Sequence, residues 1–172
     1  MVDNFLFGIL PYIVIVIAVG GLIWRYLTNQ FSYSSISSQF LEYRQLFWGS
    51  VPWHYGIIAV VIGHLIGIFL PSSVIAFNQV PLRLYILEGA AFALGLLALT
   101  GLIFLLLRRT TNPRIRVVTS GMDLVLLLLV LFQVITGDVI AIFYRWGTAW
   151  FVYTAAPYFL SLAKFSPEVG YM

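Results

Sequence analysis

Long apolar runs alternate with short polar segments along the chain. A helix crosses the hydrocarbon core of a bilayer with roughly 20 apolar residues, and four runs reach that length. The pattern predicts helices at about residues 5–27, 51–71, 82–107 and 120–143. We therefore expect an all-α transmembrane helical bundle, with four spans in one membrane domain over residues 1–172.

The polar segments predict where the helices begin and end. Ser50 is a suitable N-cap and Pro52 suits a first turn, so the second helix is expected to start there and to end at Pro71. Residues 72–81 and 110–119 are expected to be loops. Residues 144–172 mix aromatic, proline and charged positions, which predicts an outer tail and not a clean fifth span.

Composition supports a membrane protein and narrows its chemistry. Hydrophobic residues make up 62% of the chain and charged residues 9%, whereas soluble domains carry about 25% charged residues. There are no cysteines, which excludes disulfides, a Cys-ligated zinc site and an iron–sulfur cluster held by this chain. No basic patch points to nucleic acid.

The basic residues predict how the chain crosses the membrane. Arg25, Arg44, Arg108, Arg109, Arg114 and Arg116 lie after the first and third spans, whereas Arg83, Arg145 and Lys164 lie on the other side. Cytoplasmic loops carry the excess of Lys and Arg. A multi-pass protein of the cell membrane with its N-terminus outside is expected.

The only two histidines, His54 and His64, both lie in the second apolar run. An imidazole inside a membrane is costly and is by default functional, and histidine is the commonest metal ligand. Ten residues of helix give a rise of about 15 Å and a rotation of about 280°, so the two rings cannot share one ion. Each could ligate its own haem b, with a second axial ligand from a facing helix. Proton or ion handling and structural hydrogen bonding remain open alternatives.

The stretch from Trp53 to Gly67, WHYGIIAVVIGHLIG, resembles the motif of the respiratory nitrate reductase gamma subunit family, with the same spacing between histidines. Further matches follow in order along nearly the whole chain. They are LPYI (residues 10–13), WRY (24–26), SSQ (37–39) and NPRIRVVTSGMD (112–123).

The resemblance implies a five-helix, di-haem b membrane anchor that oxidises quinol near the outer face. Electrons then pass inward to an iron–sulfur beta subunit and a molybdenum-containing alpha subunit. His54 would ligate the haem nearer the cytoplasm, and His64 the haem beside the quinol site. Related anchors serve other respiratory oxidoreductases. One alternative is therefore that this chain anchors such a complex, in which electrons could flow in the reverse direction. A haem-poor structural anchor is another.

The chain departs from the family pattern in two places. The family's partner histidines lie on a fifth helix, and this chain ends at Met172, about where that helix should begin. We expect that segment to be truncated, encoded separately or supplied by another chain. The family's quinone-binding basic residue has no lysine counterpart here, and Arg83 or Tyr85 could stand in.

The remaining candidate positions surround this arrangement. Gly63 and Gly67 flank His64 and, with Arg83, are candidates for the quinol side; small residues also serve plain helix packing. Asp138 and Glu88 could relay protons or take structural roles. The arginines between the third and fourth spans are a topology signal that could also bind haem propionates or a partner subunit. They are Arg108, Arg109, Arg114 and Arg116.

Overall fold

The structure is a computed structural model that describes residues 1–28, 41–144 and 147–171. Four of its helices are long and apolar enough to cross a membrane, at Asn4–Thr28, Arg44–Phe69, Pro81–Thr111 and Gly121–Tyr144. This confirms the all-α class and the four spans. The SSQ segment (37–39) and Arg145 lie outside the described residues.

Helices α2 (Arg44–Phe69) and α4 (Pro81–Thr111) form the most extensive contact of the fold and run antiparallel. Small residues allow this approach. A Cβ atom on Gly56 would lie 2.7 Å from the Leu94 carbonyl oxygen, and one on Gly101 would lie 2.7 Å from the Gly49 carbonyl oxygen. The backbones of α2 and α4 are therefore in direct contact at both glycines.

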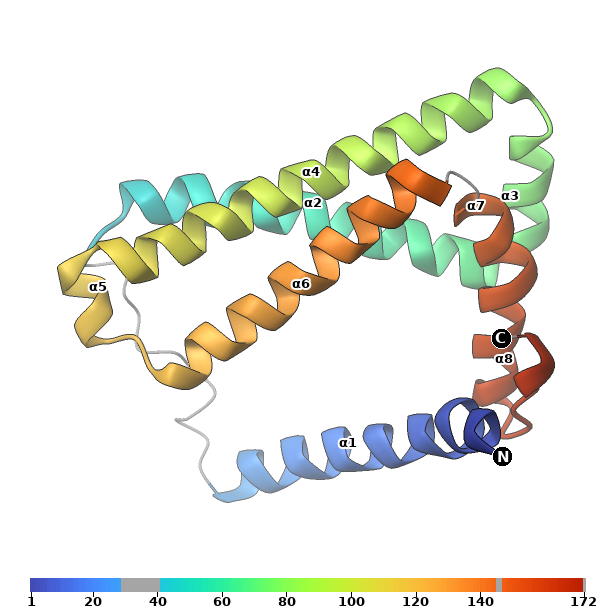
Figure 1. The fold of residues 1–172 in the computed structure, drawn as a ribbon, viewed down its shortest axis with the longest axis horizontal. Coiled ribbons are helices and arrows are strands. Elements are labelled where there is room, and N and C mark those ends of the chain that lie inside the picture. The colour runs from blue at the N-terminus through green and yellow to red at the C-terminus, as the bar shows by residue number, and fades with distance from the viewer. Residues whose placement is uncertain (29–40, 145–146, 172) are drawn as a thin grey trace.

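Helix α6 (Gly121–Tyr144) packs on another face of α4 (Figure 1). At one end of this contact Arg109 of α4 pairs with Asp123 of α6, with 3.3 Å between Nη1 and Oδ2. Further along, the Asp138 side chain lies against Gly95 of α4. Thus α4 is the central helix, with α2 and α6 on two of its faces.

The first span stands apart from this group in Figure 1 and lies against the C-terminal segment. It consists of η1 (Asn4–Ile9) and α1 (Leu10–Thr28). The Tyr12 hydroxyl donates to the Leu162 carbonyl at 2.9 Å, and the Tyr158 hydroxyl donates to the Phe7 carbonyl at 2.8 Å. These bonds bring the two ends of the chain together.

The second span begins earlier than its sequence suggested. Helix α2 starts at Arg44, so Ser50 does not cap it and Pro52 lies inside the helix. The Glu42 carboxylate instead accepts from the backbone N–H groups of Gln45 and Leu46, at 2.6 and 3.2 Å. These bonds satisfy donors that a helix start leaves free, and they stabilise a helix start upstream of Ser50.

Both connections predicted as loops contain short helices. Residues 72–81 are mostly covered by α3 (Pro71–Asn78), which follows α2 directly because Pro71 suits a first turn. The second connection contains α5 (Pro113–Val117), where the Asn112 side chain accepts from the Arg114 N–H at 3.1 Å. The next helix begins with a reciprocal cap: Ser120 N–H donates to the Asp123 carboxylate, and Asp123 N–H to Ser120 Oγ.

The predicted tail is also more ordered than expected. It forms α7 (Gly147–Trp150), η4 (Phe151–Ala155), α8 (Ala156–Ala163) and η5 (Val169–Tyr171). The apolar helix Phe151–Ala163 is shorter than the four spans. It packs against α2 and buries Val152, Ala155, Ala156 and Tyr158. Tertiary contact with α2 therefore stabilises a segment whose own pattern predicts little.

Candidate functional site

The two histidines project from α2 into similar local surroundings. His54 Nδ1 lies 2.7 Å from the carbonyl oxygen of Ser50, one turn earlier, and 3.1 Å from Ser50 Oγ. His64 Nδ1 lies 2.8 Å from the carbonyl oxygen of Val60, also one turn earlier. Both side chains are exposed on the surface of the isolated chain.

These contacts fix the chemistry of each ring. A carbonyl oxygen can only accept, so Nδ1 carries the proton in both imidazoles. In a neutral imidazole Nε2 then keeps its lone pair. A backbone carbonyl holding the distal N–H is the usual way that proteins orient a metal-bound histidine. Each ring is therefore prepared to bind a metal through Nε2.

The described residues contain no group of three His, Cys, Asp or Glu side chains that could hold a metal ion. Neither histidine therefore has two further ligands of these types beside it among the described residues. A haem supplies four nitrogen ligands of its own and needs only axial ones from protein. The single, oriented imidazole at each position thus fits a haem axial ligand better than a site for a bare ion.

The surroundings of His64 include a residue that the sequence did not single out. The Phe151 ring, in η4, meets the His64 imidazole edge to face, with 5.0 Å between the ring centroids. It also fills the notch at Gly67, where a Cβ would come within 2.8 Å of the ring. No local pattern marks Phe151, because it reaches α2 only through the tertiary fold.

The glycines near the histidines differ in their surroundings. No atom lies within 4 Å of a Cβ built on Gly63, so this position is open. Gly56 follows His54 by two residues on α2. It is buried against Leu94 and Ala98 of α4, so its role in the described fold is helix packing.

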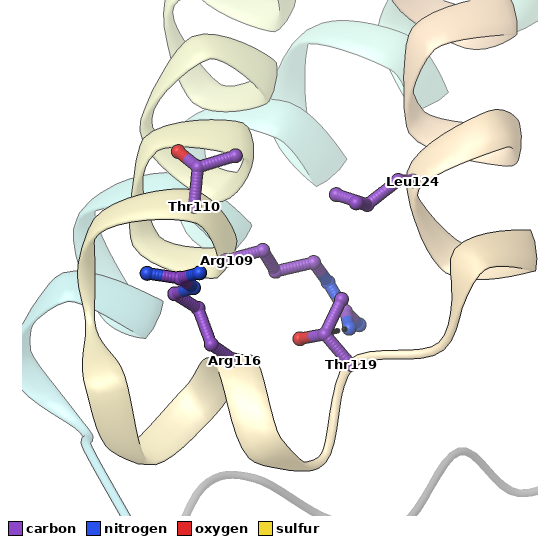
Figure 2. Close-up of a pocket in the computed structure, with 5 residues that line it drawn as sticks. All are labelled: Arg109, Thr110, Arg116, Thr119 and Leu124. Atoms are coloured by element: carbon purple, nitrogen blue, oxygen red, sulfur yellow. Dashed lines mark hydrogen bonds between the residues drawn. The ribbon is translucent and has the colours of Figure 1, made fainter.

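Two of the loop arginines line a pocket of about 400 Å³ between α4, α5 and α6. Figure 2 shows Arg109 reaching toward Thr119, and Arg116 toward Thr110. Arg109 donates to Thr119 Oγ1 at 3.4 Å and to Asp123 Oδ2 at 3.3 Å. Arg116 is exposed, as is Arg114 nearby. This pocket concentrates positive charge at one end of the bundle.

Arg108 belongs to a different environment from its neighbour. Its side chain is only 2% exposed, and its Nε donates to Glu42 Oε2 at 3.0 Å. Nη2 donates to the Glu42 backbone carbonyl at 2.9 Å. The guanidinium is therefore committed to joining the start of α2 to α4, and it does not line the pocket with Arg109 and Arg116.

The Glu42 carboxyl is tuned to stay ionised. Burial alone raises its pKa, but hydrogen bonds from Gln45 N–H, Arg108 and Leu46 N–H, together with the Arg108 charge, lower the pKa below its ordinary value. At neutral pH the pair with Arg108 is therefore fully charged.

Arg83, the candidate for the quinol side, lies at the start of α4 and far along that helix from Arg108 and Arg109. Its guanidinium sits over the Phe77 ring of α3, 5.7 Å from the centroid. The side chain is exposed at this end of the bundle. The same end carries the last turns of α2, after His64.

Comparison with known proteins decides the family. A sequence model described as nitrate reductase gamma subunit matches residues 3–172. The chain belongs to the nitrate reductase gamma subunit family. This confirms the assignment suggested by the histidine-containing motif of α2, and it makes the chain a membrane subunit of a nitrate reductase-type oxidoreductase that works with other subunits.

Individual members of the family are similar over much of the chain. The nitrate reductase gamma chain of Bacillus subtilis (strain 168) is 38% identical over 176 residues, which cover 100% of this chain and 78% of that protein. The respiratory nitrate reductase 1 gamma chain of Escherichia coli (strain K12) is 32% identical over 136 residues, covering 78% of this chain and 60% of that protein. A nitrate reductase-like protein of Mycobacterium tuberculosis is 28% identical over 139 residues, which cover 21% of its length.

Proposed function

We propose that this chain is the haem b subunit through which a nitrate reductase-type complex oxidises quinol, with one haem on His54 and a second on His64. The observation that carries the proposal is the shared orientation of the two imidazoles. Each Nδ1–H is held by the carbonyl one turn earlier on α2, which leaves each Nε2 free to bind iron. Membership of the gamma subunit family supports the same reading.

The geometry of α2 separates the two proposed centres. Ten residues along the helix place them about 15 Å apart along its axis, and about 80° apart around it. A bound haem b supplies one-electron redox chemistry. The residues of this chain would bind the iron, orient the ring and exclude water. His54 and His64 are the only histidines in these 172 residues, so the other axial ligand of each haem would not be a histidine of this sequence.

We place the quinol at the His64 end of the bundle. Gly63 leaves open space beside this histidine, and Arg83 presents a cation at the same end. An apolar wall with a few polar groups suits a quinone headgroup and its tail. Phe151, edge-on to His64, would contribute to that wall.

At the opposite end, Arg109, Arg114 and Arg116 are the groups that could bind haem propionates or a partner subunit. Arg109 and Arg116 share one pocket, and guanidinium groups pair well with carboxylates. Arg108 is left out of this set because Glu42 occupies it. The proposed partners are an iron–sulfur beta subunit and a molybdenum-containing alpha subunit.

The quinol role is tested by comparing two electron donors in the purified complex. His64→Ala should lose nitrate reduction driven by a quinol by at least tenfold, since the proposed route begins beside this residue. Nitrate reduction driven by a reduced viologen, which can reach the other subunits directly, should be kept. Tyr55→Phe, an exposed change on the same helix, is the control. Full quinol-driven activity in His64→Ala would rule out the proposed route.

The identity of the partners has its own test. An affinity tag on this chain should co-purify an iron–sulfur protein and a molybdenum protein from native membranes. Recovery of a different oxidoreductase would favour the alternative in which the chain anchors another respiratory complex.

A further inference from the structure

The α4–α6 contact contains two carboxyl groups in opposite situations. Asp123 lies near one end of α6 and pairs with Arg109. Asp138 lies 8% exposed further along the helix. Its Oδ2 atom is buried and has no hydrogen-bond partner among the described residues. A polar group buried in this way is costly, and far more so when it is ionised.

The surface of α4 is shaped to receive the Asp138 side chain. The residue opposite is Gly95, and a Cβ there would collide with Asp138 Oδ1. Gly95 lies about half-way along Pro81–Thr111. The adjoining turns of α4, at Leu94 and Ala98, contact Gly56 of α2. The carboxyl group therefore lies in the middle of the helix stack, at a level between His54 and His64.

No cation faces this carboxyl group from the described residues of the helices packed on it. Two residues seven apart on a helix differ by only about 20° in their direction around the helix axis, so they share one face. The face of α4 that contains Gly95 therefore also carries Glu88, Leu102 and Arg109. Arg109 is two heptads from Gly95, a rise of about 21 Å, and is already paired with Asp123. On α6 and α7 the other titratable groups are Asp123 and Tyr144, and Arg145 lies outside the described residues.

Without a counter-charge, an ionised carboxylate at mid-membrane depth is strongly disfavoured, and a neutral carboxylic acid is not. We propose that Asp138 is a proton-binding site in the membrane core, occupied at neutral pH. The ligand is a proton.

The site does not depend on the haem proposal. It is built from α4 and α6, whereas both histidines lie on α2. Loss of haem from a His54 or His64 variant would leave the proton site in place. Conversely, an ionised Asp138 would leave the axial-ligand assignment untouched.

Infrared spectroscopy of the full complex in membranes tests the protonation state. The wild-type-minus-Asp138→Asn difference spectrum should contain the C=O stretching band of a protonated carboxyl group, and that band should shift in D₂O. Asp138→Leu is a second variant without a carboxyl group, for the case in which the Asn amide perturbs folding. Its difference spectrum against wild type should contain the same band. Asp123→Asn is the matched control, since its ion-paired carboxylate should contribute no such band. Absence of the band from the wild-type difference spectrum would overturn the proposal.

Discussion

At the scale of single residues, the backbone of α2 orients both histidine rings. A side chain that bonds the carbonyl four residues earlier needs no other residue to select its tautomer. His54 has one further neighbour, the Ser50 hydroxyl at 3.1 Å. His64 has the Phe151 ring instead. The two positions share one device for orienting the ring and differ in what surrounds it.

The Glu42–Arg108 pair gives a prediction about stability. Glu42→Gln leaves a guanidinium that is 2% exposed without its counter-charge. Such losses cost about 3 kcal/mol, so the midpoint of thermal unfolding should fall by several degrees. Arg109→Gln is the control, because that pair is 21% and 30% exposed and should cost under about 1 kcal/mol. Equal effects of the two changes would show that burial does not set the strength of these pairs.

The same pair predicts a dependence on pH. The pKa of Glu42 is lower in the folded protein than its ordinary value, so its contribution to stability is present above the ordinary pKa. The contribution is lost as the pH falls through the lowered, folded value. Wild-type protein should therefore lose thermal stability in acid, and Glu42→Gln should lose less over the same range. An unchanged acid response in Glu42→Gln would refute the assignment.

Residue-scale features differed in how far the sequence could predict them. The two histidines were identifiable because imidazoles are rare and costly inside apolar runs. The Ser50 carbonyl contact follows from helical spacing once the helix is known to extend through Pro52. Phe151 and Glu42 could not be found, since each reaches its partner across a long sequence separation.

At the scale of elements, small residues set the distance between α2 and α4. Gly101→Ala would place a methyl group against the Trp53 and Gly49 backbones, which cannot move aside as a flexible side chain can. Overpacking of this kind costs roughly 1–3 kcal/mol. Gly89→Ala, on the same helix with no atom within 4 Å, should be neutral or slightly stabilising because alanine favours helix. Thermal unfolding of both variants checks the prediction. A stable Gly101→Ala protein would contradict the close approach.

The ends of elements were less predictable than their existence. Length and hydropathy identified all four spans. Ser50 and Pro52 carried a plausible start signal, but Glu42 supplies a cap upstream and the proline is tolerated within the helix. The short helices α3 and α8 were missed because their stability comes from packing on longer helices. Local pattern alone cannot report such contacts.

At the scale of the whole molecule, the absence of cysteine makes the topology directly measurable. The distribution of arginines predicts an N-terminus outside the cell and the α5 region inside. In intact cells, Asp3→Cys should react with a membrane-impermeant maleimide, and Arg114→Cys should react only after the cells are opened. Reactivity of Arg114→Cys from outside would reverse the proposed orientation.

The account depends most on the claim that His54 and His64 bind separate haems. The direct measurement is haem b content per gamma chain in the purified complex, from reduced-minus-oxidised optical spectra and extracted haem. His54→Ala and His64→Ala should each lose about half of the wild-type haem b, and the double variant should lose nearly all of it. Wild-type haem content in either single variant, or the loss of all haem in both, would contradict the assignment of one haem to each histidine.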